Sequence, residues 1–134
     1  MIDHVSVAVR DLSTAEPFYA AALSPLGMRK LREWPNAAIG FGKKYPEFWI
    51  NQRAAMTRVA NDCGVHICLR ATDMRAVEDF HAAALKAGGT SDGAPGLRTE
   101  YDASYYAAFV RDPDGNRVEA VTFLREAGNS PSRD

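Results

Sequence analysis

The chain has 134 residues, a size at which one domain can bury roughly two-thirds of the surface of its unfolded chain. Its 16 basic and 17 acidic side chains give a net charge of -1, which excludes the strongly basic surface that nucleic acids and anionic membranes require. The sequence has no signal-peptide pattern at its start and no run of about 18 apolar residues. We therefore expect a cytoplasmic protein whose partners include neither nucleic acid nor membrane.

The first half begins with an alternating segment, His4 to Val9, which predicts a strand with valines on one face and His4 and Ser6 on the other. Asp11 precedes a helical pattern over residues 12–23. An aspartate at this point favours a helix start, because its side chain can accept hydrogen bonds from the free N–H groups of the first turn. Three further strands are predicted over residues 28–34, 37–42 and 47–52.

The second half follows the same order. His66 to Ala71 alternates like the first strand, and Asp73 precedes a helical pattern over residues 74–87. Residues 90–104 look irregular. Strands are then predicted over residues 105–111 and 117–124, joined by Asp112-Pro113-Asp114-Gly115, whose proline and glycine are typical of a hairpin turn.

These two halves are an internal duplication. Shifting the chain by 62 residues places His4 on His66, Asp11 on Asp73 and Phe18 on Phe80. Alanine-rich helices resemble each other in any protein, but the matches outside the alanine run favour a true repeat. We predict an α+β fold in one structural domain, with two βαβββ modules that pair into an open, cup-shaped sheet with helices outside. The modules are residues 1–52 and 64–125, the linker is 53–63, and 126–134 form a flexible tail.

The repeat also predicts a metal site. His4 and His66 would meet if the two sheets pair about a pseudo-twofold axis, and Glu119 lies in an otherwise apolar strand, where an isolated carboxylate costs several kcal/mol unless it is paired or bound to a metal. Two imidazoles and one carboxylate suit a divalent ion such as Fe, Mn, Ni, Co or Zn. Glu47, in the closing strand of the first half, is a candidate fourth ligand and, with Glu119, a candidate catalytic carboxylate. A lone histidine on a strand is more often structural, so the hypothesis depends on the set.

Several side chains could bind a substrate. A glycine-rich segment and three tyrosines precede the last two strands, and they suggest either a mobile lid or an ordinary surface loop. The candidate substrate-binding residues are Trp49, Arg98, Tyr101, Tyr105 and Tyr106.

Three motifs resemble the vicinal oxygen chelate superfamily, which includes glyoxalase I, extradiol dioxygenases and bleomycin resistance proteins. They are Ile2-Asp3-His4-Val5-Ser6-Val7, Gly64-Val65-His66-Ile67 and the stretch from Ala108 to Glu119, and the resemblance covers roughly residues 1–124. It implies paired βαβββ modules around a divalent metal that chelates vicinal oxygens of a substrate. It also implies that His4, His66 and Glu119 match three ligand positions and that Glu47 approximately matches a fourth.

The resemblance implies three functions. The first is a glyoxalase-like lyase or isomerase that acts through an enediolate, with Glu119 or Glu47 moving the proton. The second is an Fe(II) dioxygenase, which the site resembles if Glu47 is not a ligand. The third is a metal-independent protein that binds a small molecule with Trp34, Trp49 and the tyrosines. The complete ligand set favours an enzyme, and we expect a homodimer.

Overall fold

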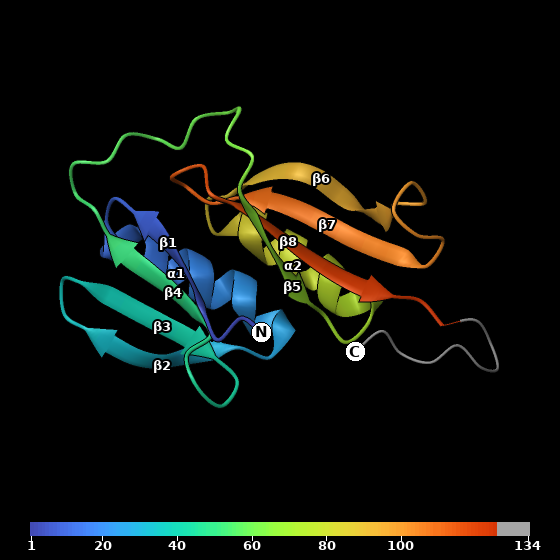
Figure 1. Cartoon of the computed structure of the whole chain (residues 1–134), viewed down its shortest axis with the longest axis horizontal. Coiled ribbons are helices and arrows are strands. Elements are labelled where there is room, and N and C mark those ends of the chain that lie inside the picture. Colours follow the sequence, from blue (N-terminus) through green and yellow to red (C-terminus); the bar gives the residue numbers. More distant parts are fainter. Residues whose placement is uncertain (126–134) are drawn as a thin grey trace.

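The computed structural model describes residues 1–125, which form two similar modules (Figure 1). The tail predicted over residues 126–134 lies outside the described residues. The first module contains β1 (Val5–Val9), α1 (Leu12–Leu23), a 3-10 turn η1 (Ser24–Leu26), β2 (Arg29–Trp34), β3 (Ala38–Gly42) and β4 (Phe48–Gln52). The second contains β5 (His66–Arg70), α2 (Met74–Lys86), β6 (Thr90–Leu97), β7 (Tyr105–Arg111) and β8 (Arg117–Phe123).

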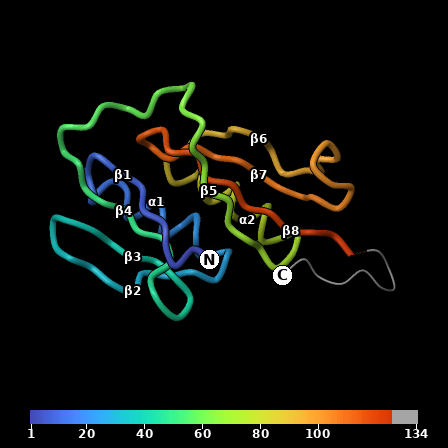
Figure 2. Tube along the Cα trace, viewed as in Figure 1, coloured from blue at the N-terminus to red at the C-terminus, as the bar shows by residue number. Residues whose placement is uncertain are grey.

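Each module folds its strands into one mixed four-stranded sheet. The strand orders are β1-β4-β3-β2 and β5-β8-β7-β6, so the first strand of each module pairs in parallel with the last strand and lies at the sheet edge. The connection from β4 in one sheet to β5 in the other runs along one edge of the molecule (Figure 2). The predicted α+β fold of two βαβββ modules is confirmed, since both sheets have the same order and each carries one helix.

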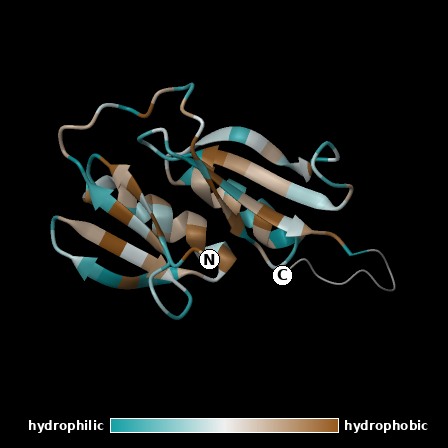
Figure 3. Cartoon of the chain, viewed as in Figure 1, coloured by the Kyte–Doolittle hydropathy of each residue, from teal (hydrophilic) through white to brown (hydrophobic). Residues whose placement is uncertain are grey.

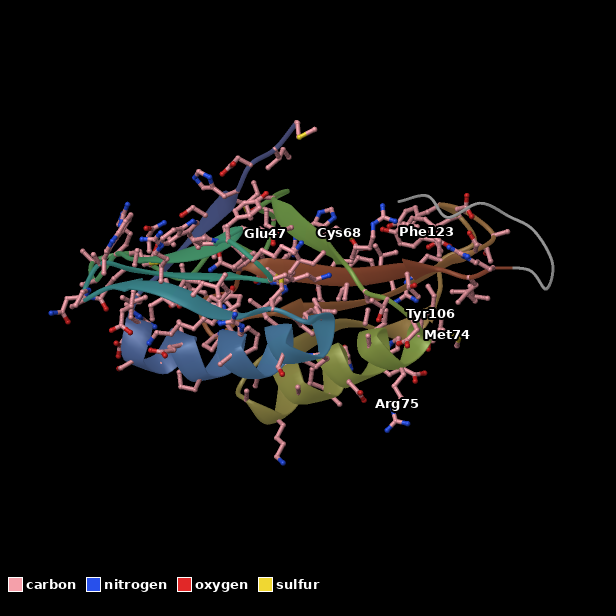
Figure 4. The ribbon with its side chains drawn as sticks, turned by 90° about the horizontal axis from the view of Figure 1, so that it is seen from below. Glu47, Cys68, Met74, Arg75, Tyr106 and Phe123 are labelled. Carbon is pink, nitrogen blue, oxygen red and sulfur yellow. The ribbon has the colours of Figure 1, made fainter. Side chains whose placement is uncertain are left out.

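Both helices lie on the same side of the two sheets (Figure 4). Asp11 and Asp73 cap them as predicted, by accepting hydrogen bonds from Ser13 N and Ala76 N. The two helices also pack against each other, so their apolar faces and the sheet faces beneath them form a single core. Apolar residues follow the central strands of both sheets (Figure 3). The largest fully buried apolar side chains are Tyr19, Phe18, Phe41, Phe48 and Phe80.

Polar contacts also join the modules. The Tyr19 hydroxyl on α1 donates a hydrogen bond to Asp112 Oδ2 in the turn between β7 and β8, at 2.6 Å. Asn116 Nδ2 in the same turn donates to Ala8 O on β1, at 2.8 Å. The turn itself has the predicted form, because Gly115 N donates to Asp112 O and Gly115 takes a φ of 93°. The second module is therefore held to the first on the helix side.

Residues 90–104 are more ordered than the sequence pattern suggests. Their first part is β6, which pairs with β7 through two register shifts around Gly93 and Gly96. Glycines and Pro95 interrupt the alternation of apolar and polar side chains in this edge strand, since proline and glycine are uncommon within regular strands. Neither helix in residues 1–125 combines the length and hydrophobicity needed to span a bilayer.

Candidate functional site

The helix-free faces of the two sheets carry the candidate site residues. On β5, His66, Cys68 and Arg70 are exposed, whereas Ile67 and Leu69 between them turn toward the core. Glu47, Cys68 and Phe123 lie on the side of the sheets away from the helices (Figure 4). The alternation of the first strand of each module therefore determines which side chains can reach a ligand.

Glu119 forms the centre of a polar cluster in the second module. Only 2% of its surface is exposed, and its Oε1 lies 3.1 Å from His66 Nε2. Its Oε2 accepts a hydrogen bond from the Tyr105 hydroxyl at 2.5 Å. Both carboxylate oxygens thus have partners, which offsets the cost of burying the charge.

Cys68 lies beside this carboxylate. Its Sγ is 3.9 Å from the Tyr105 hydroxyl, and burial, followed by the charge of Glu119, raises the pKa of the thiol to about 12. Burial and the hydrogen bond to Glu119 also raise the pKa of Tyr105. The raised pKa does not favour a thiolate nucleophile at this position. Cys63 and Cys68 are both free cysteines.

His4 lies on the wall of a cavity that it shares with His66. The cavity has a volume of about 380 Å³ and is also lined by Glu47 and Cys68. His4 directly precedes β1, and its Nδ1 lies 2.7 Å from Asp3 Oδ1. Within residues 1–125, no three side chains of the His, Cys, Asp or Glu type are grouped closely enough to hold a metal ion. The structure brings His66 and Glu119 together, whereas His4 lines the same cavity as His66 and contacts Asp3.

The His66 and Glu119 pair fits a divalent metal ion. Two ligand atoms that are each roughly 2.1 Å from a metal and at right angles are about 3 Å apart, close to the 3.1 Å between Nε2 and Oε1. The Tyr105 hydrogen bond to the other carboxylate oxygen is the kind of contact that orients a metal ligand. Two of the three predicted ligands thus lie at a separation that is compatible with a shared metal ion.

The strand register shows which residue of the first module is equivalent to Glu119, and this residue is not Glu47. On β1 and β4, Ser6 pairs with Trp49, and at the equivalent point of β5 and β8, Cys68 pairs with Glu119. Trp49, not Glu47, is therefore the repeat counterpart of Glu119. Glu47 is two residues earlier, just before β4, where its Oε1 accepts a hydrogen bond from Lys43 N at 3.4 Å. The two modules differ in length, so this register cannot be recognised from the sequence.

Trp49 instead lines an aromatic cavity of about 480 Å³ on the first sheet. Its ring stacks on Trp34, with centroids 5.0 Å apart and an interplanar angle of 24°. Gly40 is the cross-strand partner of Trp49, and a Cβ at Gly40 would meet the Trp49 ring at 3.0 Å. Arg32 and Tyr45, which belong to no motif in the sequence, also line this cavity. A glycine and a tryptophan at paired positions of neighbouring strands are a sequence signal from which this cavity could have been predicted.

The other predicted substrate-binding residues lie in different places. Tyr105 belongs to the Glu119 cluster, and Tyr101 packs edge-on against it and is 63% exposed. Tyr106 is buried on the opposite, helix-facing side, where its hydroxyl donates to Glu78. Arg98 lies over the Phe109 ring and donates to the carbonyl oxygens of Ala94 and Gly96, so it binds the end of β6. Of these four residues, Tyr105 contacts Glu119 directly and Tyr101 contacts Tyr105.

Known structures resemble this chain over most of its length. A glyoxalase/bleomycin resistance protein from Albidiferax ferrireducens T118 is 30% identical, with a TM-score of 0.74 over 88% of this chain and 94% of that one. A glyoxalase/bleomycin resistance protein/dioxygenase family enzyme from Burkholderia phytofirmans PsJN is 19% identical, with a TM-score of 0.69 over 92% and 98% of the two chains. A lactoylglutathione lyase from Agrobacterium tumefaciens is 19% identical, with a TM-score of 0.61 over 90% and 92%. The last two show likeness of fold alone.

No protein of curated function matches the sequence. The family model of the Glyoxalase/Bleomycin resistance protein/Dioxygenase superfamily matches residues 1–120, which include the first module, most of the second module and the His66 and Glu119 pair. With the repeated βαβββ architecture, this match establishes that the chain belongs to the glyoxalase/bleomycin resistance protein/dioxygenase superfamily.

Proposed function

We propose that this protein is a metal-dependent enzyme that acts on a small molecule with two vicinal oxygens, with His4, His66 and Glu119 as the metal ligands. The observation that carries the proposal is the buried Glu119 carboxylate, held between His66 Nε2 and the Tyr105 hydroxyl on an open sheet face. An imidazole and a carboxylate held side by side on one sheet face are ligand types that divalent metal ions such as Fe and Zn accept.

When bound, a divalent metal, whether Fe, Ni, Zn, Mn or Co, would act as a Lewis acid on the two substrate oxygens. Side chains of the protein orient the metal ligands and provide the surface for the substrate. Tyr105 fixes the rotamer of Glu119 through Oε2 and leaves Oε1 directed toward His66. The Trp34 and Trp49 pair offers an apolar surface in the cavity that also contains His4.

The position of Glu47 affects the choice between the two candidate reactions. A glyoxalase-like lyase, the first function implied by the sequence, needs a carboxylate to move a proton between adjacent carbons. Because Trp49 occupies the position equivalent to Glu119, the first module supplies no carboxylate ligand there, and the proton would be moved by Glu119 itself or by Glu47 on the cavity wall. A dioxygenase needs only two imidazoles, one carboxylate and open coordination positions. This observation favours Fe(II)-dependent dioxygen chemistry on a catechol-like substrate as the second candidate.

We also propose that the working form is a homodimer. His4 lines the cavity beside His66 but does not join the His66 and Glu119 pair within residues 1–125, and the helix-free faces of both modules are open. If the first module of one copy faces the second module of another, His4 of that copy can complete the site. Solution mass measured by light scattering tests this, and a monomer at enzyme assay concentrations would contradict it.

The function is tested on untagged protein. We expect one metal ion per site by elemental analysis, lost in His66→Ala and Glu119→Gln, with His81→Ala as a control because His81 lies on α2 and bonds to Ser91. Protein loaded anaerobically with iron is then assayed for oxygen consumption with catechols, and Ni-loaded or Zn-loaded protein for turnover of hemithioacetals. Ligand binding that is unaffected by metal removal and by His66→Ala would instead indicate a binding protein.

A further inference from the structure

The aromatic cavity of the first module is shaped by how two tryptophans lie on the sheet. The residues on either side of Trp49 in β4 belong to the core, so Trp49 itself faces the helix-free side. On β3, Gly40 is the strand partner of Trp49, and Ala38 is the strand partner of Trp34. Glycine and alanine are the smallest residue types, and they leave room for a flat layer of rings above this strand.

One side of this layer is closed and the other is open. A Cβ on Gly40 would lie 3.0 Å from both Cε2 and Cη2 of Trp49, so the Trp49 ring lies directly against the glycine. Trp34 stacks on Trp49, yet 57% of its own surface is exposed. A ring that is covered on one face and still so exposed presents its other face to solvent. Trp34 is therefore the free end of the stack.

A third aromatic side chain, Tyr45, lines the same cavity and is also exposed. Single exposed apolar residues are ordinary on protein surfaces, but several that gather around one hollow mark a binding site. The volume of about 480 Å³ is in the range of small-molecule sites, which are lined largely by apolar and aromatic side chains. The cavity therefore has the size and the lining of a ligand site.

The wall that carries Tyr45 is already in place. It belongs to the turn between β3 and β4, where Glu47 N donates to Phe41 O at 2.9 Å. Pro46 follows Tyr45 and packs above Gly40, since a Cβ on this glycine would lie 2.7 Å from Pro46 Cβ. A ligand would not have to order this turn, and a preformed wall lowers the entropic cost of binding.

The arrangement of the rings favours a flat ligand over a cation. An aromatic cage for a cation needs rings that surround one point from different sides. Trp34 and Trp49 instead lie nearly parallel, with an interplanar angle of 24°. Arg32 and Asp3 also line the cavity and carry opposite charges, so charge alone selects neither a cation nor an anion.

The polar lining is less suited to a sugar. A sugar that stacks on a tryptophan also needs hydrogen-bond partners for its hydroxyl groups. Two polar side chains of the cavity bond to each other, because Asn51 Nδ2 donates to Ser6 Oγ. A planar aromatic ring needs only a flat, open surface, and offset stacking is one of its preferred contacts.

The aromatic cavity meets the proposed metal site at His4. Asp3 and His4 line both this cavity and the cavity that contains His66. A small molecule whose ring lies on Trp34 can therefore extend past His4 toward the metal ligands.

We propose that the aromatic cavity binds a planar aromatic ring, stacked on the exposed face of Trp34, and that this ring belongs to the substrate. The inference rests on the proposed function only in assigning the ring to the substrate. The stacking itself needs no metal.

The test uses metal-free full-length protein and two probes, 2-naphthol and its saturated counterpart decahydro-2-naphthol. The chain has only two tryptophans, and both line the aromatic cavity, so both indole N–H signals in an NMR titration report on this site. We expect saturable shifts of these signals with 2-naphthol. Its affinity should be about 3-fold to 10-fold higher than that of the saturated probe, since stacking adds to the apolar area that both probes bury.

Trp34→Ala should weaken the binding of 2-naphthol by at least about 10-fold, because it removes the ring on which the probe stacks. Trp34→Phe keeps a smaller ring and should retain part of the affinity. Leu85→Ala is the matched control, since it removes an exposed apolar side chain of α2 on the other side of the sheets, and it should leave the binding unchanged. If Trp34→Ala fails to fold, Trp34→Phe and the comparison of the two probes decide.

No saturable binding of 2-naphthol, equal affinity for the saturated probe, or an equal loss in Leu85→Ala would overturn the aromatic site. His66→Ala separates this site from the metal site, because 2-naphthol binding should survive in that variant while metal is lost. Stacking in a protein that turns over neither catechols nor hemithioacetals would support the site and overturn its assignment to a substrate. Turnover without any binding of 2-naphthol would overturn the site and leave the proposed enzyme in place.

Discussion

Tyr19 and Asp112, 93 residues apart in sequence, form a buried hydrogen bond between the two modules, with 2.6 Å from the phenol oxygen to Oδ2. Tyr19 is fully buried on α1, and Asp112 is 2% exposed in the turn between β7 and β8. The other carboxylate oxygen of Asp112 accepts from the backbone N–H groups of Asp114 and Asn116. This bond therefore couples the shape of the turn to the packing of the first helix.

Tyr19→Phe should destabilise the protein by about 1–3 kcal/mol, because it removes a donor from a buried carboxylate and leaves the packing of the ring intact. Urea denaturation followed by circular dichroism measures the change. Tyr45→Phe is the control, since Tyr45 is 52% exposed and its substitution should change the unfolding free energy by less than about 0.5 kcal/mol. Equal stability of Tyr19→Phe and the wild type would show that water replaces this bond.

Asp112 should also make stability depend on pH. Burial raises the pKa of its carboxyl above the ordinary value of 3.8, and the hydrogen bonds from Tyr19 and Asn116 only partly oppose this. The folded protein therefore retains this proton to a higher pH than the unfolded chain. The contribution of Asp112 to stability is complete below the unfolded pKa and declines as the pH rises through the folded pKa.

Asp112→Asn should remove this decline. The variant is expected to be less stable overall, because an amide cannot accept all the hydrogen bonds of the carboxylate. We measure the unfolding free energy of both proteins at intervals upward from pH 4. The unfolding free energy of the variant should change less steeply with pH than that of the wild type, because the other acidic residues are the same in both proteins. Parallel curves would mean that the Asp112 pKa is the same in the folded and unfolded states.

Much of this fold could be predicted from the sequence because the repeat gives each local pattern twice. The alternation at His4 and His66, and the aspartates before both helices, depend only on side-chain periodicity and capping, which are local properties. Glu119 could be identified for a similar reason, as a carboxylate in an apolar strand. The edge strand β6 was missed because glycine and proline break its pattern.

The counterpart of Glu119 in the first module could not be predicted in this way. It depends on how β4 is registered against β1, and that register is determined by the lengths of the intervening hairpins rather than by local pattern. A shift of two residues keeps the same sheet face, so alternation alone cannot distinguish Glu47 from Trp49.

Gly40→Ala should disrupt the Trp34 and Trp49 stack. The new Cβ would lie 2.7 Å from Pro46 Cβ and 3.0 Å from the Trp49 ring, so the ring or the turn beside it must move. These are the only two tryptophans of the chain, and their close stacking should give a coupled circular dichroism signal that this variant and Trp34→Ala both lose. Gly64→Ala is the matched control, because a Cβ there meets no atom within 4 Å. An unchanged signal in Gly40→Ala would show that the stack adjusts without separating.

Tyr105→Phe should weaken metal binding without abolishing it. The substitution keeps the aromatic contacts with Tyr101 and Phe123 but removes the hydrogen bond to Glu119 Oε2. Loss of such a supporting bond typically lowers metal affinity by about 10-fold to 100-fold. Competition with a chelating dye measures the affinity, and Tyr101→Phe, which alters an exposed hydroxyl on the neighbouring ring, should leave it unchanged. Because the urea denaturation curve of metal-free Tyr105→Phe reports its fold separately, a normal fold with unchanged metal affinity would remove Tyr105 from the proposed site and weaken the role assigned to Glu119.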